Sequence, residues 1–264
     1  MKQFIPTLLA ITATTALAQP LPNTKPLKIE GDLSAQMVAG IDIFLTQKLQ
    51  ESTTKRARFW KHDDSSRDAY QQSISANRKH FRFCIGATDK RLPIKFLQLN
   101  STTTSSSILY ADAKVTIHTV RWPVFPGVHG EGLLLKPTGA VKARVVAIPD
   151  ADHTPEQITG LHKILPPRSQ FALRLADAGC LVVVPTLIDR RDEWSGDERV
   201  AFTNQPHREW IYRQAYQMGR HIIGYEVQKI LSLIDWFAHE NSLIPDPVPM
   251  GVVGQGEGGL IAFY

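Results

Sequence analysis

A glycine-rich segment at residues 250–259 (MGVVGQGEGG) has the pattern with the clearest chemical meaning in this sequence. An apolar run followed by closely spaced glycines predicts a buried strand, a tight turn and the start of a helix. Some hydrolytic enzymes use this arrangement in the pattern G-x-S-x-G, in which a nucleophilic serine lies at the apex of the turn. Gly254 and Gly258 match the two glycines, and Gly256 takes the place of the serine. Glycine has no side chain that could attack a carbonyl group, so the sequence predicts no catalytic residue here.

Such a turn works together with an oxyanion hole, which two backbone N–H groups form. One belongs to the residue after the nucleophile, here Glu257, and the other to the loop after an earlier buried strand. That loop reads Asp150-Ala151-Asp152-His153. Ala151 is therefore the second candidate donor, and Asp150 and Asp152 are candidate pocket residues. Both aspartates also follow a proline and are common turn residues, and we favour this simpler interpretation over a metal or acid–base role.

The same glycines allow two other interpretations. Gly254, Gly256 and Gly259 fit G-x-G-x-x-G, the dinucleotide fingerprint, in which a pyrophosphate lies at a helix N-terminus. That pattern needs an acidic residue about 20 positions further on, which these 264 residues do not reach. Glu257 would also place a carboxylate beside the phosphates. Alternatively, the glycines serve only to pack a strand closely against a helix, and we regard the dinucleotide site as the weaker alternative.

Other polar clusters give weaker indications. His207 and His221 are 14 positions apart, so they do not form the i, i+4 pair that binds a metal on one helix face, and we predict no metal site. Residues 189–192 (DRRD) with Trp194 fit a sugar-binding lip or, more simply, a solvated loop. Four charged residues of the later helical stretch are expected to form ion pairs: Arg208, Glu209, Arg213 and Glu226.

The first 18 residues have the pattern of a secretory signal peptide. Lys2 precedes a mostly apolar stretch, and residues 16–18 (ALA) form a cleavage site before Gln19. The stretch is too short and too rich in threonine for a stable membrane span, which needs about 20 apolar residues. We therefore predict export to the periplasm or the extracellular space. The mature chain of about 246 residues is long enough for one α/β domain with a core.

The chain has a formal net charge of +5, but its basic residues are dispersed. The densest group, within residues 55–61, is followed by acidic residues rather than by aromatic ones. A solvated helix face accounts for this group better than a nucleic-acid surface does, and we predict no nucleic-acid partner. Cys84 and Cys180 lie in apolar runs, so we favour two buried thiols over a disulfide.

Apolar spacing divides the mature chain into a helical part and an α/β part. A proline-rich tether at 19–31 precedes a helical segment that begins after Asp32 and ends in a Ser/Thr-rich linker, together residues 32–107. Residues 108–264 then alternate strands and helices, as in a sheet covered on both faces. The predicted fold class is α/β, with a mixed, mostly parallel sheet that is incomplete at its C-terminal side.

The expected elements of the second part are a hairpin, two buried strands, three helical stretches and the strand before the glycines. In chain order they are 114–120 with 131–136, 144–149, a helix from Pro155, 169–178 closed by Gly179, 180–185, 207–239 and 250–253. The helix from Pro155 carries a capping pattern at 154–157 (TPEQ). An apolar stripe is expected to dock the stretch 207–239 on the sheet; its residues are Ile223, Val227, Ile230, Ile234 and Phe237.

The chain resembles exported α/β-hydrolases of the acetyl xylan esterase-like and dienelactone hydrolase-like kind. The resemblance rests on five segments: 122–123 (WP), 130–135 (GEGLLL), 148–152 (IPDAD), 205–210 (QPHREW) and 219–229 (GRHIIGYEVQK). It covers the N-terminal portion of such a protein. It implies an acylated glycan or a small ester as ligand and no cofactor.

Active members of these families carry a serine at the turn, followed by an aspartate and a histidine. Here Gly256 replaces the serine, and no acid–histidine pair follows within the 264 residues. We therefore expect an esterase-related protein that is catalytically inactive. The alternative is a non-catalytic glycan-binding or partner-binding protein on the same fold.

In such a fold the strand before the turn lies in the middle of the sheet. The strand 250–253 is followed by only a short helical stretch, so we expect one of its edges to be open. Open apolar edges recruit other chains, and self-association is the expected consequence.

Overall fold

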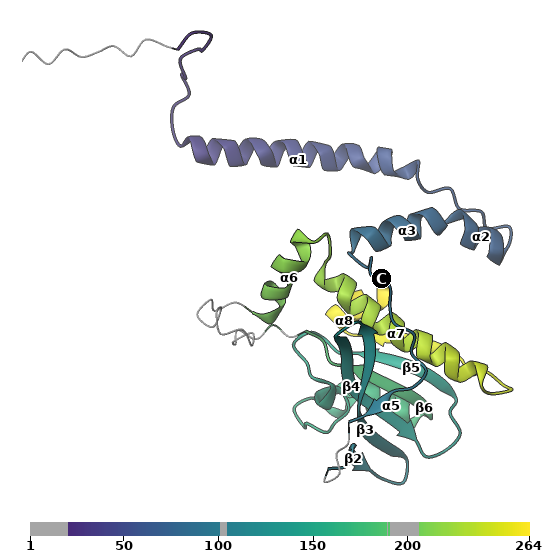
Figure 1. Ribbon diagram of the computed structural model, residues 1–264. Coiled ribbons are helices and arrows are strands. Elements are labelled where there is room, and N and C mark those ends of the chain that lie inside the picture. Colours follow the sequence, from purple (N-terminus) through teal and green to yellow (C-terminus); the bar gives the residue numbers. More distant parts are fainter. Residues whose placement is uncertain (1–20, 101–104, 189, 191–205) are drawn as a thin grey trace, which may run out of the picture. The chain divides into compact units, whose positions relative to one another are not determined.

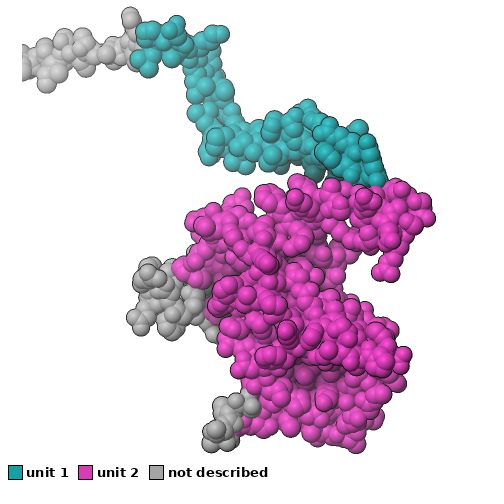
Figure 2. Space-filling model, turned by 45° about the vertical axis from the view of Figure 1, so that its right-hand side comes forward, with its two compact units in different colours: residues 1–61 teal, residues 62–264 magenta. Residues whose placement is uncertain are grey.

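The computed structural model describes residues 21–100, 105–188, 190 and 206–264. The signal peptide and most of the expected sugar-binding lip (189, 191–194) lie outside the described residues. The chain forms two compact units, residues 1–61 and 62–264 (Figure 2). The division therefore falls after Lys61 rather than in the Ser/Thr-rich segment.

The first unit contains one long helix, α1 (Leu33–Ala57) (Figure 1). Asp32 caps it, because its side chain accepts hydrogen bonds from the backbone N–H groups of Ser34 and Ala35. The predicted helix after Asp32 is thus present. None of its residues is buried in the described structure, so its apolar side chains remain exposed.

The second unit is built on a seven-stranded sheet. Its strands are β1 (Gln98–Leu99), β2 (Ile108–Ala111), β3 (Val115–Phe125), β4 (Val128–Pro137), β5 (Ala143–Ile148), β6 (Cys180–Pro185) and β7 (Met250–Gly254). The order is β1-β3-β4-β6-β5-β7, and β2 also pairs with β3. The predicted hairpin is β3–β4, and β5 pairs in parallel with both β6 and β7. The sheet is therefore mixed, and its parallel part is centred on β5.

The described part of this unit also contains the helices α2 (Arg67–Ser73), α3 (Ser75–Cys84), α4 (Pro155–Ile158), α5 (Phe171–Asp177), α6 (His207–Gln217), α7 (Ile222–Ser242) and α8 (Glu257–Phe263). Some of these helices pack on the sheet and cover both of its faces. One core packs α7 against β3, β5 and β6, and includes Trp122, Ile148 and Phe237. The other packs α4 and α5 against the opposite face and includes Leu133 and Val182. This is the layered α/β architecture that the sequence predicts.

Local sequence signals explain where these helices begin and end. The capping box at Thr154 and Gln157 is formed, and Gly179 closes α5 with a φ of +96°. The stretch 207–239 is not continuous, because Gly219 has a φ of +66° and His221 caps a new helix, α7. The backbone turns between α6 and α7 at a residue that tolerates this conformation.

The segment before the hairpin belongs to the same compact unit. Ile85, Ala87 and Ile94 are buried in the core that contains α7. Gly86 and Gly224 allow a close approach, because a Cβ atom on Gly224 would lie 2.3 Å from the carbonyl oxygen of Ile85. Residues 85–94 of the expected helical part are therefore packed on the α/β core.

Two expectations about burial are wrong. β7 was expected to be buried, but Met250, Val252 and Val253 are 37–44% exposed, because β7 is the edge strand of the described sheet. Cys84 was expected to be buried, but it is exposed at the end of α3, with its Sγ 3.6 Å from Nε2 of His80. Cys180 is partly buried, and both thiols are free.

Candidate functional site

The glycine cluster forms the predicted strand–turn–helix, and we call the turn at residues 254–258 the elbow. β7 ends at Gly254, and α8 begins at Glu257. Gly256, at the apex, has φ +56° and ψ −124°, a conformation that residues with a side chain rarely adopt. A side chain held in this strained conformation is typical of an exposed nucleophile, and here the conformation is kept without one.

The two flanking glycines are required by close packing. A Cβ atom on Gly254 would lie 2.0 Å from the carbonyl oxygen of Gly258. A Cβ atom on Gly258 would lie 2.3 Å and 2.4 Å from the carbonyl oxygens of Pro149 and Ile148. α8 therefore sits directly against the end of β5. Close packing of the backbone therefore explains why positions 254 and 258 are glycines, and no ligand is needed to explain them.

The carboxylate of Asp150 occupies the space above the apex. Asp150 follows Pro149 after the end of β5, and its Oδ2 accepts a hydrogen bond from the backbone N–H of Glu257 at 2.9 Å. Its Oδ1 accepts another from the N–H of Asp152 at 3.1 Å. A Cβ atom on Gly256 would lie only 1.6 Å from the Oδ2 of Asp150. The carboxylate thus stands where a side chain at position 256 would begin.

The environment of Asp150 favours its charged form. Partial burial raises the pKa of the carboxyl group, whereas the hydrogen bonds from the N–H groups of Asp152 and Glu257 lower it. The positive charge of Arg190 also lowers this pKa, and together the lowering effects outweigh burial. Asp150 therefore holds a negative charge next to the elbow at neutral pH.

Two arginines bind the side chain of Glu257. Arg190 contacts one carboxylate oxygen at 2.7 Å, and Arg208 contacts the other. The side chains of Glu257 and Arg208 are only 11% and 14% exposed, so this ion pair is largely shielded from solvent. Arg190 also pairs with Asp152 at 2.8 Å, and that carboxylate is 62% exposed. These contacts connect the elbow to the loops after β5 and β6 and to α6.

A buried carboxylate positions the loop after β6. Glu226 on α7 is fully buried, and it accepts a hydrogen bond from the N–H of Ile188 at 2.7 Å. Lys229 neutralises Glu226 at 2.6 Å and donates to the carbonyl oxygen of Thr186, also at 2.6 Å. Arg208 donates to the carbonyl oxygen of Ile188 at 3.0 Å. The loop that carries Arg190 is thus held from α6 and α7.

The structure brings together some of the residues that the sequence singled out. Asp150, Gly256 and Glu257 meet directly, whereas Asp152 is linked to Glu257 through Arg190. The Glu257 N–H is engaged by Asp150 and is not open to a ligand in this conformation. Ala151 is buried in the turn beside Asp150, 4% exposed. The roles of both candidate donors remain predictions.

The sequence reasoning missed the arginine contacts. Arg208 was expected in an ion pair within its own helical stretch, but its partner is Glu257, 49 positions away. The expected i, i+4 pattern does hold for Glu209 and Arg213, at 2.7 Å. Arg190 belonged to the charged loop, and no local signal indicated that it reaches the elbow.

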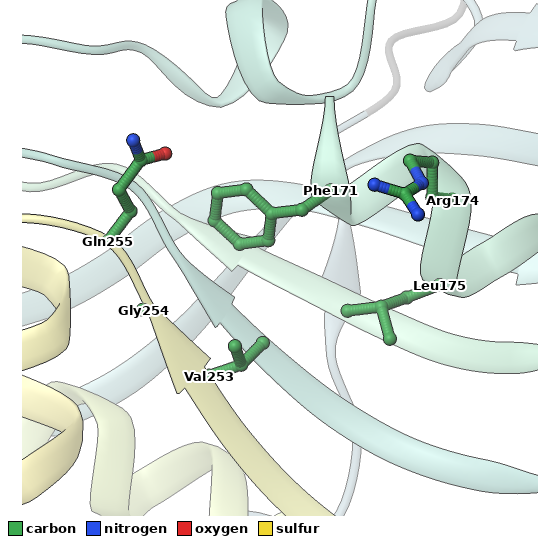
Figure 3. Close-up of a pocket in the computed structure, with 6 residues that line it drawn as sticks. All are labelled: Phe171, Arg174, Leu175, Val253, Gly254 and Gln255. Carbon is green, nitrogen blue, oxygen red and sulfur yellow. The ribbon is translucent and has the colours of Figure 1, made fainter. Parts of the chain in front are cut away.

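A cavity of about 370 Å³ lies beside the elbow, between α5 and the end of β7 (Figure 3). The residues that line it are Phe171, Arg174, Leu175, Val253, Gly254 and Gln255. The Phe171 ring points from α5 toward the Gly254–Gln255 backbone (Figure 3). Asp150 and Asp152, which were candidate pocket residues, do not line this cavity.

Other ligand classes find little support in the described residues. Asp150 fills the space over Gly256 that a pyrophosphate would approach in the dinucleotide interpretation. Residues 21–100, 105–188, 190 and 206–264 contain no group of three or more side chains suited to hold a metal ion. Within the same ranges, no helix is both long and apolar enough to span a membrane.

Comparison with known proteins defines the fold. No protein-family model and no curated protein matches the sequence. A crystal structure from Bacteroides fragilis, described as an acetyl xylan esterase, matches with a TM-score of 0.51 and 15% identity, over 77% of this chain and 52% of that chain. The unit that contains the elbow has the α/β-hydrolase fold. The chain spans about half the length of that structure.

Further solved structures are similar at a lower level. Acetyl xylan esterase 1 from Thermoanaerobacterium sp. matches with a TM-score of 0.38 and 10% identity, over 72% of this chain and 52% of that chain. Dienelactone hydrolase from Anabaena variabilis matches with a TM-score of 0.33 and 20% identity, over 56% of each chain.

Proposed function

We propose that this chain is an exported α/β-hydrolase-like protein, related to carbohydrate and carboxylic-ester esterases, that does not hydrolyse esters at its elbow. The observation that carries the proposal is Gly256 at the apex of the turn. The backbone there has the strained geometry of a nucleophile position, φ +56° and ψ −124°, but no side chain. Without a nucleophile, the acyl-transfer route of a serine esterase has no first step.

The second support is the state of the oxyanion donor. The Glu257 N–H would stabilise the negative oxygen of a tetrahedral intermediate in an active relative. Here it donates to Asp150 at 2.9 Å. A substrate oxygen would have to displace a carboxylate to reach it. The elbow therefore lacks a nucleophile, and the N–H group expected to donate to the oxyanion is already hydrogen-bonded to Asp150.

Hydrolysis of p-nitrophenyl acetate tests this proposal. The purified mature chain is expected to hydrolyse this ester no faster than buffer alone, because binding and a blocked donor leave only residual catalysis. An active acetyl xylan esterase serves as the positive control. Saturable turnover that a serine-directed phosphonate abolishes would contradict the proposal, since it would require a nucleophile elsewhere.

The Gly256→Ser variant sharpens the same test. It is expected to stay inactive, because the serine side chain would collide with the carboxylate of Asp150. Activity in this variant would show that the site already contains a functioning base.

Export is a separate part of the proposal. Cleavage after Ala18 is expected to give a chain that begins at Gln19. The intact mass of the protein recovered from outside the cytoplasm measures this directly. A mass that retains residues 1–18 would favour an anchor instead.

A non-catalytic binding function is the second candidate, and the cavity beside the elbow favours it. An aromatic ring, an arginine and an amide (Phe171, Arg174 and Gln255) surround about 370 Å³ of largely apolar space. This combination suits an acylated sugar, whose ring stacks on aromatic groups and whose oxygens accept hydrogen bonds. Titration calorimetry with acetylated xylo-oligosaccharide should detect binding that Phe171→Ala weakens and that the control Phe96→Ala, an exposed phenylalanine elsewhere, leaves unchanged. Equal binding by both variants would argue against this cavity as the site.

A further inference from the structure

We propose that the elbow is a carboxylate-binding site whose resident ligand is the side chain of Asp150. This inference deepens the proposed function and rests on it: the site lacks a nucleophile and is also closed by the protein's own carboxylate. If so, the carboxylate of Asp150 and a side chain at position 256 cannot occupy the elbow at the same time.

The first argument is space. A Cβ atom on Gly256 would lie 1.6 Å from the Oδ2, 2.7 Å from the Cγ and 3.3 Å from the Cβ of Asp150. No side chain at position 256 can coexist with this rotamer of Asp150. The neighbouring glycines differ in kind, because Gly254 and Gly258 are restricted by backbone carbonyl groups that cannot move independently. At position 256 the obstacle is the movable end of a side chain.

The second argument is the hydrogen bond. An oxyanion hole offers backbone N–H groups to a negatively charged oxygen. The Oδ2 of Asp150 is such an oxygen, and it takes the Glu257 N–H at 2.9 Å. The carboxylate therefore satisfies the donor that would otherwise face the open site, and it does so from a neighbouring loop rather than from the apex.

The third argument is charge. Glu257 would repel a carboxylate next to its own backbone, but Arg190 and Arg208 both pair with it. Arg190 also attracts Asp150. Asp150 thus faces the positive charge of Arg190 and one carboxylate, that of Glu257, which already has partners. The charges around Asp150 therefore favour a negatively charged carboxylate at this position.

Asp152 provides a matched control for Asp150. It lies on the same loop, two positions away, and also carries a carboxylate. Its side chain is 62% exposed, and its ion pair is with Arg190 at 2.8 Å. A change at Asp152 removes a similar charge from the same loop while the apex contact remains in place.

A double-variant experiment on thermal stability tests the exclusivity. Gly256→Ala is expected to lower the melting temperature for two reasons. The new Cβ displaces the side chain of Asp150, and the alanine must adopt a backbone conformation that is strained for it. In an Asp150→Ala background the displacement no longer occurs. There the same Gly256→Ala change should lower the melting temperature by roughly 2–4 °C less than in the unmodified chain. The Asp152→Ala background should give no such relief.

A second series separates the effect of space from the effect of charge. Asp150→Asn has nearly the same shape, so Gly256→Ala should remain as harmful in that background as in the unmodified chain. Relief from Asp150→Ala but not from Asp150→Asn supports the proposal. Equal losses of melting temperature for Gly256→Ala in all backgrounds would overturn it.

Rescue by formate probes the carboxylate site itself. Asp150→Ala leaves the Glu257 N–H facing an open space of carboxylate size. Sodium formate should therefore raise the melting temperature of this variant more than sodium chloride at equal ionic strength, and the unmodified chain and Asp152→Ala should not respond. If formate acts equally on all three proteins, the site does not bind a carboxylate.

These outcomes are distinguishable from failure of the proposed function. Ester hydrolysis by the unmodified chain would contradict the lack of activity without altering the melting temperatures. Additive losses of melting temperature, or equal effects of formate, would contradict the role of Asp150 without making the chain an esterase.

Discussion

Gly256 keeps a backbone conformation that is strained for every other residue, although the side chain that usually justifies it is missing. The φ of +56° carries little strain for glycine. Gly254 and Gly258 do not have this conformation, and they are required because a side chain there would collide with backbone carbonyl groups. At the scale of single residues, the elbow is therefore well formed structurally and empty chemically, with Asp150 in the available space.

Asp150 should make the stability of the fold depend on pH. Its folded-state pKa is lower than the ordinary 3.8, so its contribution is present above the unfolded value and is lost as the pH falls through the folded value. The difference in urea midpoint between the unmodified chain and Asp150→Asn should have its largest value above about pH 5 and should decrease steadily toward pH 3. Equilibrium unfolding at several pH values measures it.

The exposed Asp152 is the control for this experiment. Asp152→Asn removes a carboxylate of the same loop that has no contact with the Glu257 N–H, so its effect at neutral pH should be smaller than that of Asp150→Asn. A difference for Asp150→Asn that stays constant from pH 7 to pH 3 would contradict the assigned role of its carboxylate.

At the scale of elements, α8 is docked on the end of β5 through a glycine contact. Gly258→Ala would place a methyl group 2.3 Å from the carbonyl oxygen of Pro149. Because backbone must move to relieve this overlap, we expect a loss of about 1–3 kcal/mol in the free energy of unfolding. Chemical denaturation with a circular dichroism signal measures the loss.

Gly251→Ala is the matched control for Gly258→Ala. Gly251 lies in β7, and a Cβ atom there meets nothing within 4 Å. Its substitution should be neutral or slightly stabilising, because alanine restricts the unfolded chain more than glycine does. Similar losses for both variants would mean that α8 does not rest on β5 as described.

The elements themselves could be predicted from the sequence because their signals are local. The capping box at Thr154, the closing Gly179 and the alternation in β3 each involve residues a few positions apart. The glycine turn after β7 was predicted on the same basis. The apolar run alone predicted a buried strand, whereas the open edge that was also expected leaves the side chains of β7 partly exposed.

The candidate site could be predicted only in part, for the same physical reason. Asp150 and Glu257 were both singled out, but their contact joins residues 107 positions apart. The contact between Arg208 and Glu257 depends on how α6 is placed. No periodicity or turn signal encodes such pairs, because they arise only when the sheet and its helices assemble.

At the scale of the whole molecule, the open edge of β7 is the expected site of self-association. In the described chain β7 pairs with β5 on one side only, and Val252 and Val253 are 37% and 38% exposed. We expect a second copy to pair there, because an apolar edge strand offers free backbone groups to another strand. Size-exclusion chromatography with light scattering should show masses above the monomer that rise with concentration.

Charge on the edge should oppose this association. Val252→Lys is expected to shift the protein toward the monomer, because a lysine on an edge strand disfavours pairing with another sheet. An exposed valine of the hairpin turn, Val128, provides the control variant Val128→Lys. A sharp monomer peak at all concentrations, with a cooperative melt above about 60 °C, would show that the edge is protected.

The position of β5 between β6 and β7 also has a consequence for the time course of folding. The hairpin β3–β4 joins neighbouring stretches of the chain, whereas the pairing of β5 with β7 joins Arg144 to Met250. Closing so long a loop is slow until the intervening helices have docked. The hairpin should therefore form early and the elbow last. During biosynthesis the carboxylate of Asp150 should remain solvated and without its partner Glu257 until nearly the whole described chain has been made.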